Sequence, residues 1–374
     1  MLHTYIMYPV LLFALSKIAT AKKNENSFSY DELPEIAVIC AAYNEEKVII
    51  QKIESIFKTN YPKEKIRFFI GTDACSDNTV YLIKQQQKKY SQIELVEFTE
   101  RTGKINIINK LAEMADAPVF IMTDANVFFT ENTLHELVKP LKENNVQLTC
   151  ANIQKLALNK ETVTKNELGY FNFENFLKKS ESDLWSVVIG VEGGCYAIKK
   201  SAFKYVPNNF TVDDFFIASE VLSNKGHILF AENAFAYEDL AADTSGEYRR
   251  KTRIATGNFQ NLFYFKKILN PFSRVGFAYL SHKVLRWLTP FLFLMNLSCL
   301  AFLYSDHLIF KIIFFSEIVV LTIPLFSFIL RRINIQIGAL STLNHFVMMN
   351  VALFVGFFRY CKGVESSVWQ PVKR

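Results

Sequence analysis

The stretch Pro118-Val-Phe-Ile-Met-Thr-Asp-Ala-Asn126 passes from an apolar run directly into two residues with side-chain oxygens. The run has the length and composition of a buried β-strand, so Asp124 and Asn126 are expected just beyond its carboxyl end. Carboxylate and amide oxygens are ligands that hard divalent cations such as Mg²⁺ and Mn²⁺ accept. This stretch therefore predicts a strand that delivers a metal-binding motif.

A second acidic cluster, Val212-Asp213-Asp214-Phe215, lies in a distant part of the chain. Both acids could cap the helix predicted over residues 214–223, but a cap needs only one acid. A carboxylate that arrives from a separate segment can act as a general base. A metal ion together with a base is what the displacement of a diphosphate from a sugar nucleotide requires.

Short apolar runs alternate with helical patterns through the middle of the chain. The predicted strands are residues 36–42, 67–72, 93–98 and 119–123, and helices are predicted between them, including residues 48–57 and 103–115. This alternation predicts an α/β fold with a mostly parallel twisted sheet covered on both faces. Ligands of such sheets bind beyond the carboxyl ends of the strands.

Polar residues follow three of these strands at the point where each strand ends. They are Tyr43-Asn44-Glu45, Asp73, and Asp124 with Asn126. One polar residue there is usually a turn or a helix cap, but polar residues at three strand ends indicate a ligand site. The glycine fingerprint GxGxxG is absent after the first strand, which argues against a dinucleotide-dependent dehydrogenase.

Apolar residues make up 50% of the 374 residues, and mean hydropathy is +0.12, which is high for a soluble enzyme. The excess lies at the two ends. Residues 1–21 form a predicted membrane anchor, because the basic pair Lys22-Lys23 follows the apolar core, whereas a signal peptide carries its charge before it. The basic flank is expected on the inner side of the membrane.

Three long apolar segments, residues 285–304, 308–330 and 342–360, are predicted to lie in lipid. Their basic flanks, Arg331-Arg332 and Lys362, cannot both lie inside after three simple spans, so the number and direction of the crossings stay open. Residues 263–286 mix aromatic, basic and apolar side chains. They fit either a helix in the headgroup plane or an amphipathic helix that covers the middle domain.

The net charge of +6 is concentrated near the apolar segments. We expect these basic residues to meet lipid headgroups or phosphates, and the absence of a stripe of interleaved aromatic and basic residues argues against nucleic acid. The six cysteines are scattered without a CxxC pair, which indicates reduced thiols in a cytosol-facing protein. A transporter is disfavoured because the lipid segments hold almost no charge.

Seven motifs appear in a fixed order between about residues 35 and 260. They are Ala42-Tyr-Asn-Glu-Glu46, Thr72-Asp-Ala-Cys-Ser-Asp-Asn-Thr79, Arg101-Thr-Gly-Lys104 with Asn109, Thr123-Asp-Ala-Asn126, Val191-Glu-Gly-Gly-Cys195, Val212-Asp-Asp-Phe215 and Arg250-Lys-Thr-Arg-Ile254. In these motifs the sequence resembles family-2 glycosyltransferases of GT-A fold. It is most similar to the membrane-anchored branch of cellulose, chitin, hyaluronan and poly-N-acetylglucosamine synthases.

The resemblance implies a donor-nucleotide site made by six residues: Tyr43, Asn44, Glu45, Asp73, Lys104 and Asp124. Asp73 would hydrogen-bond uracil, and the glycine that usually follows it is Ala74 here. The divalent cation, Mn²⁺ or Mg²⁺, would be held by Asp124 and Asn126. Because Asn126 offers no full negative charge, the cation should depend more on the donor diphosphate.

The same resemblance implies the catalytic groups. Asp214 would be the base, supported by Asp213, and Arg253 would contact phosphate. Four residues would lie on the acceptor side: Glu192, Gly193, Gly194 and Arg250. The segment 192–194 also fits a plain β-turn. The last residue of the final motif is Ile254 where polymerising relatives have tryptophan. Isoleucine at this position favours transfer of one sugar over processive synthesis.

These inferences predict four regions: an anchor at 1–21, a GT-A catalytic domain at 22–262, an interfacial segment at 263–286 and a membrane region with its tail at 287–374. The closing Trp369–Arg374 also resembles a signature of membrane members. The expected reaction is an inverting transfer of a hexose or N-acetylhexosamine from a UDP-sugar to a glycan or lipid-linked acceptor. It would occur at the cytosolic face of the cell membrane in cell-surface polysaccharide synthesis. A processive synthase and a non-catalytic sugar-nucleotide-binding subunit of an export complex are the alternatives.

Overall fold

The computed structural model describes residues 2–18, 32–156, 165–239, 244–332 and 338–364, so the Trp369–Arg374 tail lies outside the described residues. The described residues form an eight-stranded sheet in the order β3-β2-β1-β4-β7-β6-β8-β5. The strands are β1 (Ile36–Ala42), β2 (Ile66–Asp73), β3 (Ile93–Phe98), β4 (Val119–Thr123), β5 (Val127–Phe129), β6 (Val146–Leu156), β7 (Cys195–Lys199) and β8 (His227–Asp239).

The first half of the sheet confirms the predicted parallel arrangement. β1 pairs in parallel with both β2 and β4, and β2 pairs in parallel with β3. The connections carry α2 (Ile49–Phe57), α3 (Thr79–Gln87) and α4 (Lys104–Met114). Side chains of β1 alternate between two apolar cores, one on each face of the sheet, which explains why its sequence is continuously apolar.

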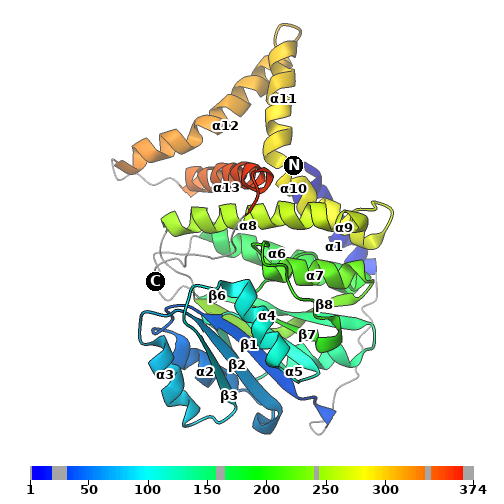
Figure 1. Ribbon diagram of the computed structural model, residues 1–374. Helices are drawn as coiled ribbons and strands as arrows, with labels where there is room; N and C mark the ends of the chain where they lie inside the picture. The colour runs from blue at the N-terminus through cyan, green and yellow to red at the C-terminus, as the bar shows by residue number, and fades with distance from the viewer. Residues whose placement is uncertain (1, 19–31, 157–164, 240–243, 333–337, 365–374) are drawn as a thin grey trace.

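The second half of the sheet is mixed, so the prediction of a mostly parallel sheet holds only for the first half. β7 runs antiparallel to both β4 and β6. The reason is the position of α6 (Lys165–Trp185), which lies across the carboxyl edge of the sheet instead of along a face (Figure 1). After α6 the chain therefore re-enters the sheet at the carboxyl edge, where β6 ends. β7 begins there, with Cys195 beside Thr123 at the end of β4.

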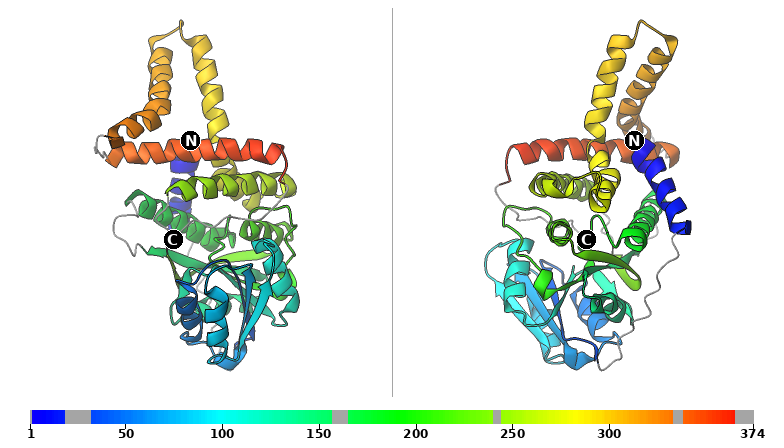
Figure 2. Two further views of the ribbon diagram at one scale, coloured as in Figure 1. Left: turned by 60° about the vertical axis from the view of Figure 1, so that its left-hand side comes forward. Right: turned by 90° about the vertical axis from the view of Figure 1, so that its right-hand side faces the viewer.

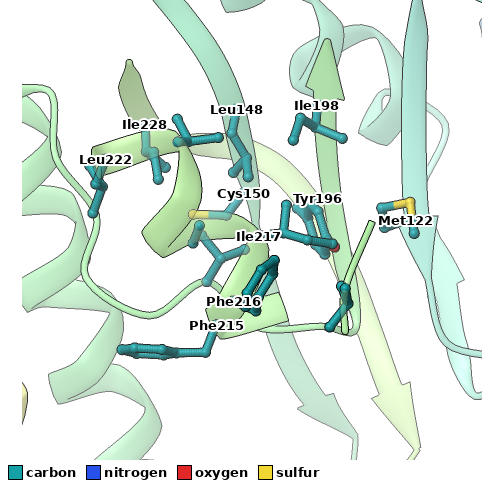
Figure 3. Close-up of a cluster of buried hydrophobic side chains, with 14 of the residues drawn as sticks. Met122, Leu148, Cys150, Tyr196, Ile198, Phe215, Phe216, Ile217, Leu222 and Ile228 are labelled. Carbon is teal, nitrogen blue, oxygen red and sulfur yellow. The ribbon is translucent and has the colours of Figure 1, made fainter. Parts of the chain in front are cut away.

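The helix α7 (Asp213–Ser223) packs on one face of this mixed half. Figure 3 shows its apolar residues, including Phe216 and Ile217, facing Leu148 and Tyr196 of the sheet. These side chains are almost fully buried, which fixes the axis of the helix. As a result, the amino end of α7 delivers Asp213 and Asp214 to the carboxyl edge of the sheet.

The amino-terminal helix is attached to the α/β domain. It consists of a π-helical turn (His3–Met7) and α1 (Tyr8–Ile18), and Tyr8 is fully buried. The Tyr8 hydroxyl donates to Glu181 Oε1 of α6 at 2.8 Å, and His282 Nδ1 lies 2.8 Å from the same oxygen. The other side of the helix exposes apolar side chains, among them Ile6, Val10 and Phe13.

The carboxyl-terminal third is helical, as predicted. α8 (Thr244–Tyr264) runs through the expected boundary at residue 262 and packs beside α13 (Gly338–Cys361), while α11 (Thr289–Leu303) and α12 (Leu308–Arg332) project away as a hairpin (Figures 1 and 2). Residues 263–286 form several short helices instead of one, including α9 (Arg274–Tyr279) and α10 (Leu285–Trp287). Residues 269–273, which include Pro271, separate a short helical turn at Lys266–Ile268 from α9.

The membrane role of these helices stays a prediction. Among the described residues, no individual helix combines the length and hydropathy that a bilayer crossing requires. Residues 274–287 and 289–303 reach that standard only as a pair, with a 62° bend between them.

Candidate active site

The loops after β1 and β2 are joined by hydrogen bonds between their polar residues. Asn44 Nδ2 donates to Ser76 Oγ at 3.1 Å, and the Ser76 amide donates back to Asn44 Oδ1 at 2.9 Å. The Glu45 amide donates to Thr79 Oγ1 at 2.8 Å. The predicted nucleotide residues Tyr43, Asn44 and Glu45 therefore form one wall with the loop that follows Asp73.

The turn after Asp73 contains a strained residue. Ala74 has a φ of +51°, in the left-handed region where a Cβ costs about 1–2 kcal/mol. We expect Ala74→Gly to raise the free energy of unfolding by about 1 kcal/mol, measured by thermal denaturation, despite glycine's entropic cost. The control is Ala112→Gly inside α4, which should lower it. A lower melting temperature for Ala74→Gly would contradict the strain argument.

Asp73 holds the segment that begins α4. Its carboxylate accepts hydrogen bonds from Arg101 Nε at 3.0 Å and from the Thr102 amide at 2.6 Å, and its side chain is 2% exposed. The Arg101 guanidinium lies 3.5 Å from the centre of the Tyr43 ring, a cation–π contact. Asp73 thus positions the loop that leads into Lys104 at the start of α4, and its contact with uracil stays a prediction.

Lys104 joins the two acidic clusters that the sequence singled out. Its Nζ lies 2.8 Å from Asp124 Oδ1 and 3.5 Å from Asp213 Oδ1. Burial alone would lower the Lys104 pKa, but the carboxylates of Asp124, Asp213 and Asp214 outweigh burial and raise it. Burial likewise opposes ionisation of Asp124, yet the charge of Lys104 leaves the Asp124 pKa below its usual value.

Asp214 differs from its neighbours in its protonation behaviour. It lies at the amino end of α7, where the Phe215 amide donates to its Oδ1 at 2.6 Å. Burial, followed by the nearby charge of Asp213, raises the Asp214 pKa to about 7. A carboxylate with that pKa is well matched to take a proton near neutral pH. Among the three aspartates, it is the one suited to act as a base.

The loop before β7 contacts both Asp124 and Asp214. The Gly194 carbonyl accepts hydrogen bonds from Thr123 Oγ1 at 2.8 Å and from the Asp124 amide at 3.3 Å. A Cβ on Gly193 would lie 2.7 Å from Asp214 Oδ2, so the Asp214 carboxylate lies directly against this glycine. Glu192 pairs with Lys178 of α6, a buried partner that sequence reasoning missed.

α8 places two arginines, Arg250 and Arg253, near these aspartates. Arg253 Nη1 donates to the Thr211 carbonyl at 2.6 Å, which braces the loop that leads into Asp213. Arg250 Nη2 is 3.9 Å from Glu238 Oε1, and Glu238 also pairs with Lys155. Arg250 is close enough to contribute to the lowered Asp124 pKa.

Sequence reasoning also missed Lys52, which lies beneath the metal motif. This fully buried side chain donates from Nζ to Thr123 Oγ1 at 2.7 Å and to the Val127 carbonyl at 2.5 Å, clamping both sides of the turn 124–126. Burial lowers the Lys52 pKa to about 8. The available signal was a lysine on the apolar face of α2, between Ile49 and Ile53.

We expect Lys52→Met to lower the free energy of unfolding by about 2 kcal/mol, because the buried Val127 carbonyl loses its ammonium donor. Chemical denaturation measures the loss. The control is Lys58→Met just after the same helix, where the side chain is 71% exposed and stability should not change. Equal stabilities of the two variants would show that the clamp has no structural role.

The site suits a divalent cation only in part. Asp124 and Asn126 supply hard oxygen ligands, and the Lys104 ammonium already occupies the acidic face as a cation. Within the described ranges, no group of three or more His, Cys, Asp or Glu side chains is arranged to hold a metal ion. The residues therefore fit a cation that completes its coordination with oxygens from a bound ligand.

Comparison with known proteins defines the class. Residues 37–206 match the model of the family described as Glycosyl transferase family 2. The chain is 22% identical over 238 residues to "Probable glycosyltransferase YdaM" of Bacillus subtilis, covering 61% of this chain and 56% of that protein. It is 21% identical to "Poly-beta-1,6-N-acetyl-D-glucosamine synthase" of Staphylococcus epidermidis, covering 62% and 57% respectively. The chain thus spans little more than half the length of these curated relatives.

A solved structure shows the same fold. "Mannosyltransferase PcManGT from Pyrobaculum calidifontis in complex with GDP-Man and Mn2+" superposes with a TM-score of 0.69 at 19% identity, covering 94% of both chains. The chain therefore has a GT-A-like α/β fold with a curled mixed sheet. Its residues 37–206 are a family-2 glycosyltransferase domain.

Proposed function

We propose that this glycosyltransferase transfers a hexose or N-acetylhexosamine from a UDP-sugar to a hydroxyl group of a glycan or lipid-linked acceptor, with inversion to a β-linkage. The observation that carries the proposal is the placement of Asp214 against Gly193, beside the Lys104–Asp124 pair. A carboxylate with a pKa of about 7 there can accept a proton from a hydroxyl.

The described residues supply each part of a single displacement. Asp214 takes the proton as the acceptor oxygen attacks the anomeric carbon, and Asp213 supports it. Lys104 and Arg253 offer positive charge to the departing diphosphate. Asp124 and Asn126 would hold a divalent cation, Mn²⁺ or Mg²⁺, which neutralises diphosphate charge when bound. A single displacement inverts the anomeric centre, so it needs no nucleophilic carboxylate of the kind that retaining glycosidases use.

The donor assignment rests on the loop around Asp73. The motif from Asp73 to Thr79 resembles the uracil-binding loop of the family, which favours UDP. PcManGT was crystallised with GDP-Man and Mn²⁺, so guanine nucleotides belong in any test and Mn²⁺ is the first cation to try. Single transfer is favoured over polymerisation because Ile254 stands where processive relatives carry an aromatic residue.

We place the catalytic domain, residues 22–262, on the cytosolic face of the cell membrane. Residues 1–21, 263–286 and 287–374 would contact or cross the lipid. The support is the apolar surface of α1, α11 and α12, where Val10, Met295 and Val319 are about 60% exposed. The expected partners are membrane lipid, the sugar acceptor and proteins of polysaccharide export, without nucleic acid.

The test is nucleotide release by the detergent-purified protein. UDP-glucose, UDP-galactose, UDP-N-acetylglucosamine and GDP-mannose are each supplied with Mn²⁺, Mg²⁺ or EDTA. Release from one UDP-sugar, abolished by EDTA, would support the proposal and identify the sugar. Release from GDP-mannose alone would overturn the uracil assignment. Nucleotide binding without release from any donor, even with membrane lipid extracts as acceptors, would favour a non-catalytic subunit.

A further inference from the structure

Lys104 occupies the acidic centre of the site as if it were a bound cation. Its ammonium contacts carboxylates from two separate segments, Asp124 at the end of β4 and Asp213 at the start of α7. The side chain is 22% exposed, so one side of it faces open space. Since Lys104 directly follows Gly103 at the first turn of α4, its four-carbon stem can swing without moving the helix.

This contact competes with the divalent cation that the proposed function needs. Lys104 Nζ is hydrogen-bonded to Asp124 Oδ1, an oxygen of the carboxylate that would bind the cation. A divalent cation bound at Asp124 would also stand close to the ammonium, and like charges at such distances repel strongly in a partly buried site. Metal binding and the observed Lys104 position are therefore mutually unfavourable.

We propose that Lys104 is an internal counter-ion that holds the acidic site in the free protein and transfers to the donor diphosphate when nucleotide and divalent cation bind. The inference rests on the proposed function. The incoming diphosphate offers Lys104 a new anionic partner, which releases the Asp124 carboxylate for the cation. The cation and nucleotide then bind cooperatively, and Lys104 is the residue that couples them.

A counter-ion role of Lys104 couples the affinities for the cation and the nucleotide, which a purely structural lysine would not do. In the free protein, Lys104 weakens cation binding, because it neutralises Asp124. In the nucleotide complex, it strengthens nucleotide binding by contacting the diphosphate. Removing the Lys104 charge should therefore tighten cation binding, weaken nucleotide binding, and reduce the factor by which each ligand increases the affinity for the other.

The experiment measures Mn²⁺ binding by electron paramagnetic resonance, with and without saturating UDP, on the detergent-purified full chain. For the wild-type protein, UDP should tighten Mn²⁺ binding at least about tenfold. Lys104→Met should bind Mn²⁺ about tenfold more tightly than wild type without UDP, bind UDP more weakly, and show little further tightening when UDP is added. Lys104→Arg, which keeps the charge, should retain the coupling.

The matched control is Lys110→Met on the same helix, where the lysine is 52% exposed and pairs with Glu113. It should behave as wild type. If Lys104→Met folds poorly by melting temperature, Lys104→Gln removes the same charge and carries the same expectation. If the wild-type protein binds UDP and Mn²⁺, but removing the Lys104 charge leaves the Mn²⁺ affinity unchanged, the counter-ion role is wrong and the donor site stands. A wild-type protein that binds neither UDP nor GDP would overturn the donor site itself.

Discussion

Replacement of Asp214 by asparagine is expected to lower kcat about a thousandfold while nucleotide affinity stays near the wild-type value. Asparagine keeps the size of the side chain but cannot take a proton from the acceptor hydroxyl, and general-base catalysis typically contributes about 10²–10⁴ in rate. The measurement is steady-state sugar transfer with the active donor, beside UDP binding by calorimetry. An Asp214→Asn enzyme with more than a tenth of wild-type kcat would show that the base lies elsewhere.

The pH profile tests the same assignment independently. Because burial and Asp213 raise the Asp214 pKa to about 7, the carboxyl is protonated and inactive as a base below that pH. The value of kcat/KM should therefore rise with pH through about 7 and level off above it. Asp213→Asn removes one cause of the raised pKa, so its profile should shift toward lower pH. If kcat/KM does not change between about pH 5 and 8, the assignment of Asp214 as the base is wrong.

The second large effect is expected at Gly193. A methyl group there would lie 2.7 Å from Asp214 Oδ2, which is closer than a carbon can approach this oxygen, and a tight 3.2 Å from its Cγ, so the carboxylate or the loop must shift. Because the carboxylate is also held by the Phe215 amide, Gly193→Ala should displace the base or the acceptor loop. A displacement of about 1 Å in such a site costs about a hundredfold in kcat.

The matched control is Gly169→Ala in α6, where an added Cβ meets nothing within 4 Å. It should leave kcat close to wild type and raise the free energy of unfolding by about 0.5–1 kcal/mol, because alanine favours a helix over glycine. Gly193→Ala should keep its melting temperature within a few degrees and retain UDP affinity, since the nucleotide wall around Asn44 and Asp73 is untouched. Unchanged kcat in Gly193→Ala would mean that Asp214 can move freely and is not held by this loop.

The sequence was sufficient to predict the parallel half of the sheet and the meeting of its polar ends. Runs such as Ile36–Ala42 are apolar at every position, which indicates burial on both faces, and parallel strands place their carboxyl ends at one edge. Asp73 and Asp124 were found on this basis alone. The antiparallel entry of β7 was not predictable, because it depends on α6 lying across the edge of the sheet.

The sequence assigned different roles to its aspartates only through the family resemblance, because the residue types alone do not distinguish them. Asp124, Asp213 and Asp214 are equivalent as letters, yet one is paired with Lys104 and another has its pKa raised to about 7. Lys52 and Lys178 are both buried against the site, although lysine is usually found on the surface. Such differences arise from neighbours that are distant in sequence.

By itself, then, the sequence determined which chemistry-bearing residues reach the carboxyl edge of the sheet, because strand periodicity and parallel pairing are local properties of the chain. Only the tertiary structure decided how those residues act. The packing of α7 and the Gly193–Gly194 loop sets the distance from Asp214 to its neighbours, and the approach of Lys104 sets which carboxylate is neutralised. Charges and desolvation depend on distances in space, which folding creates.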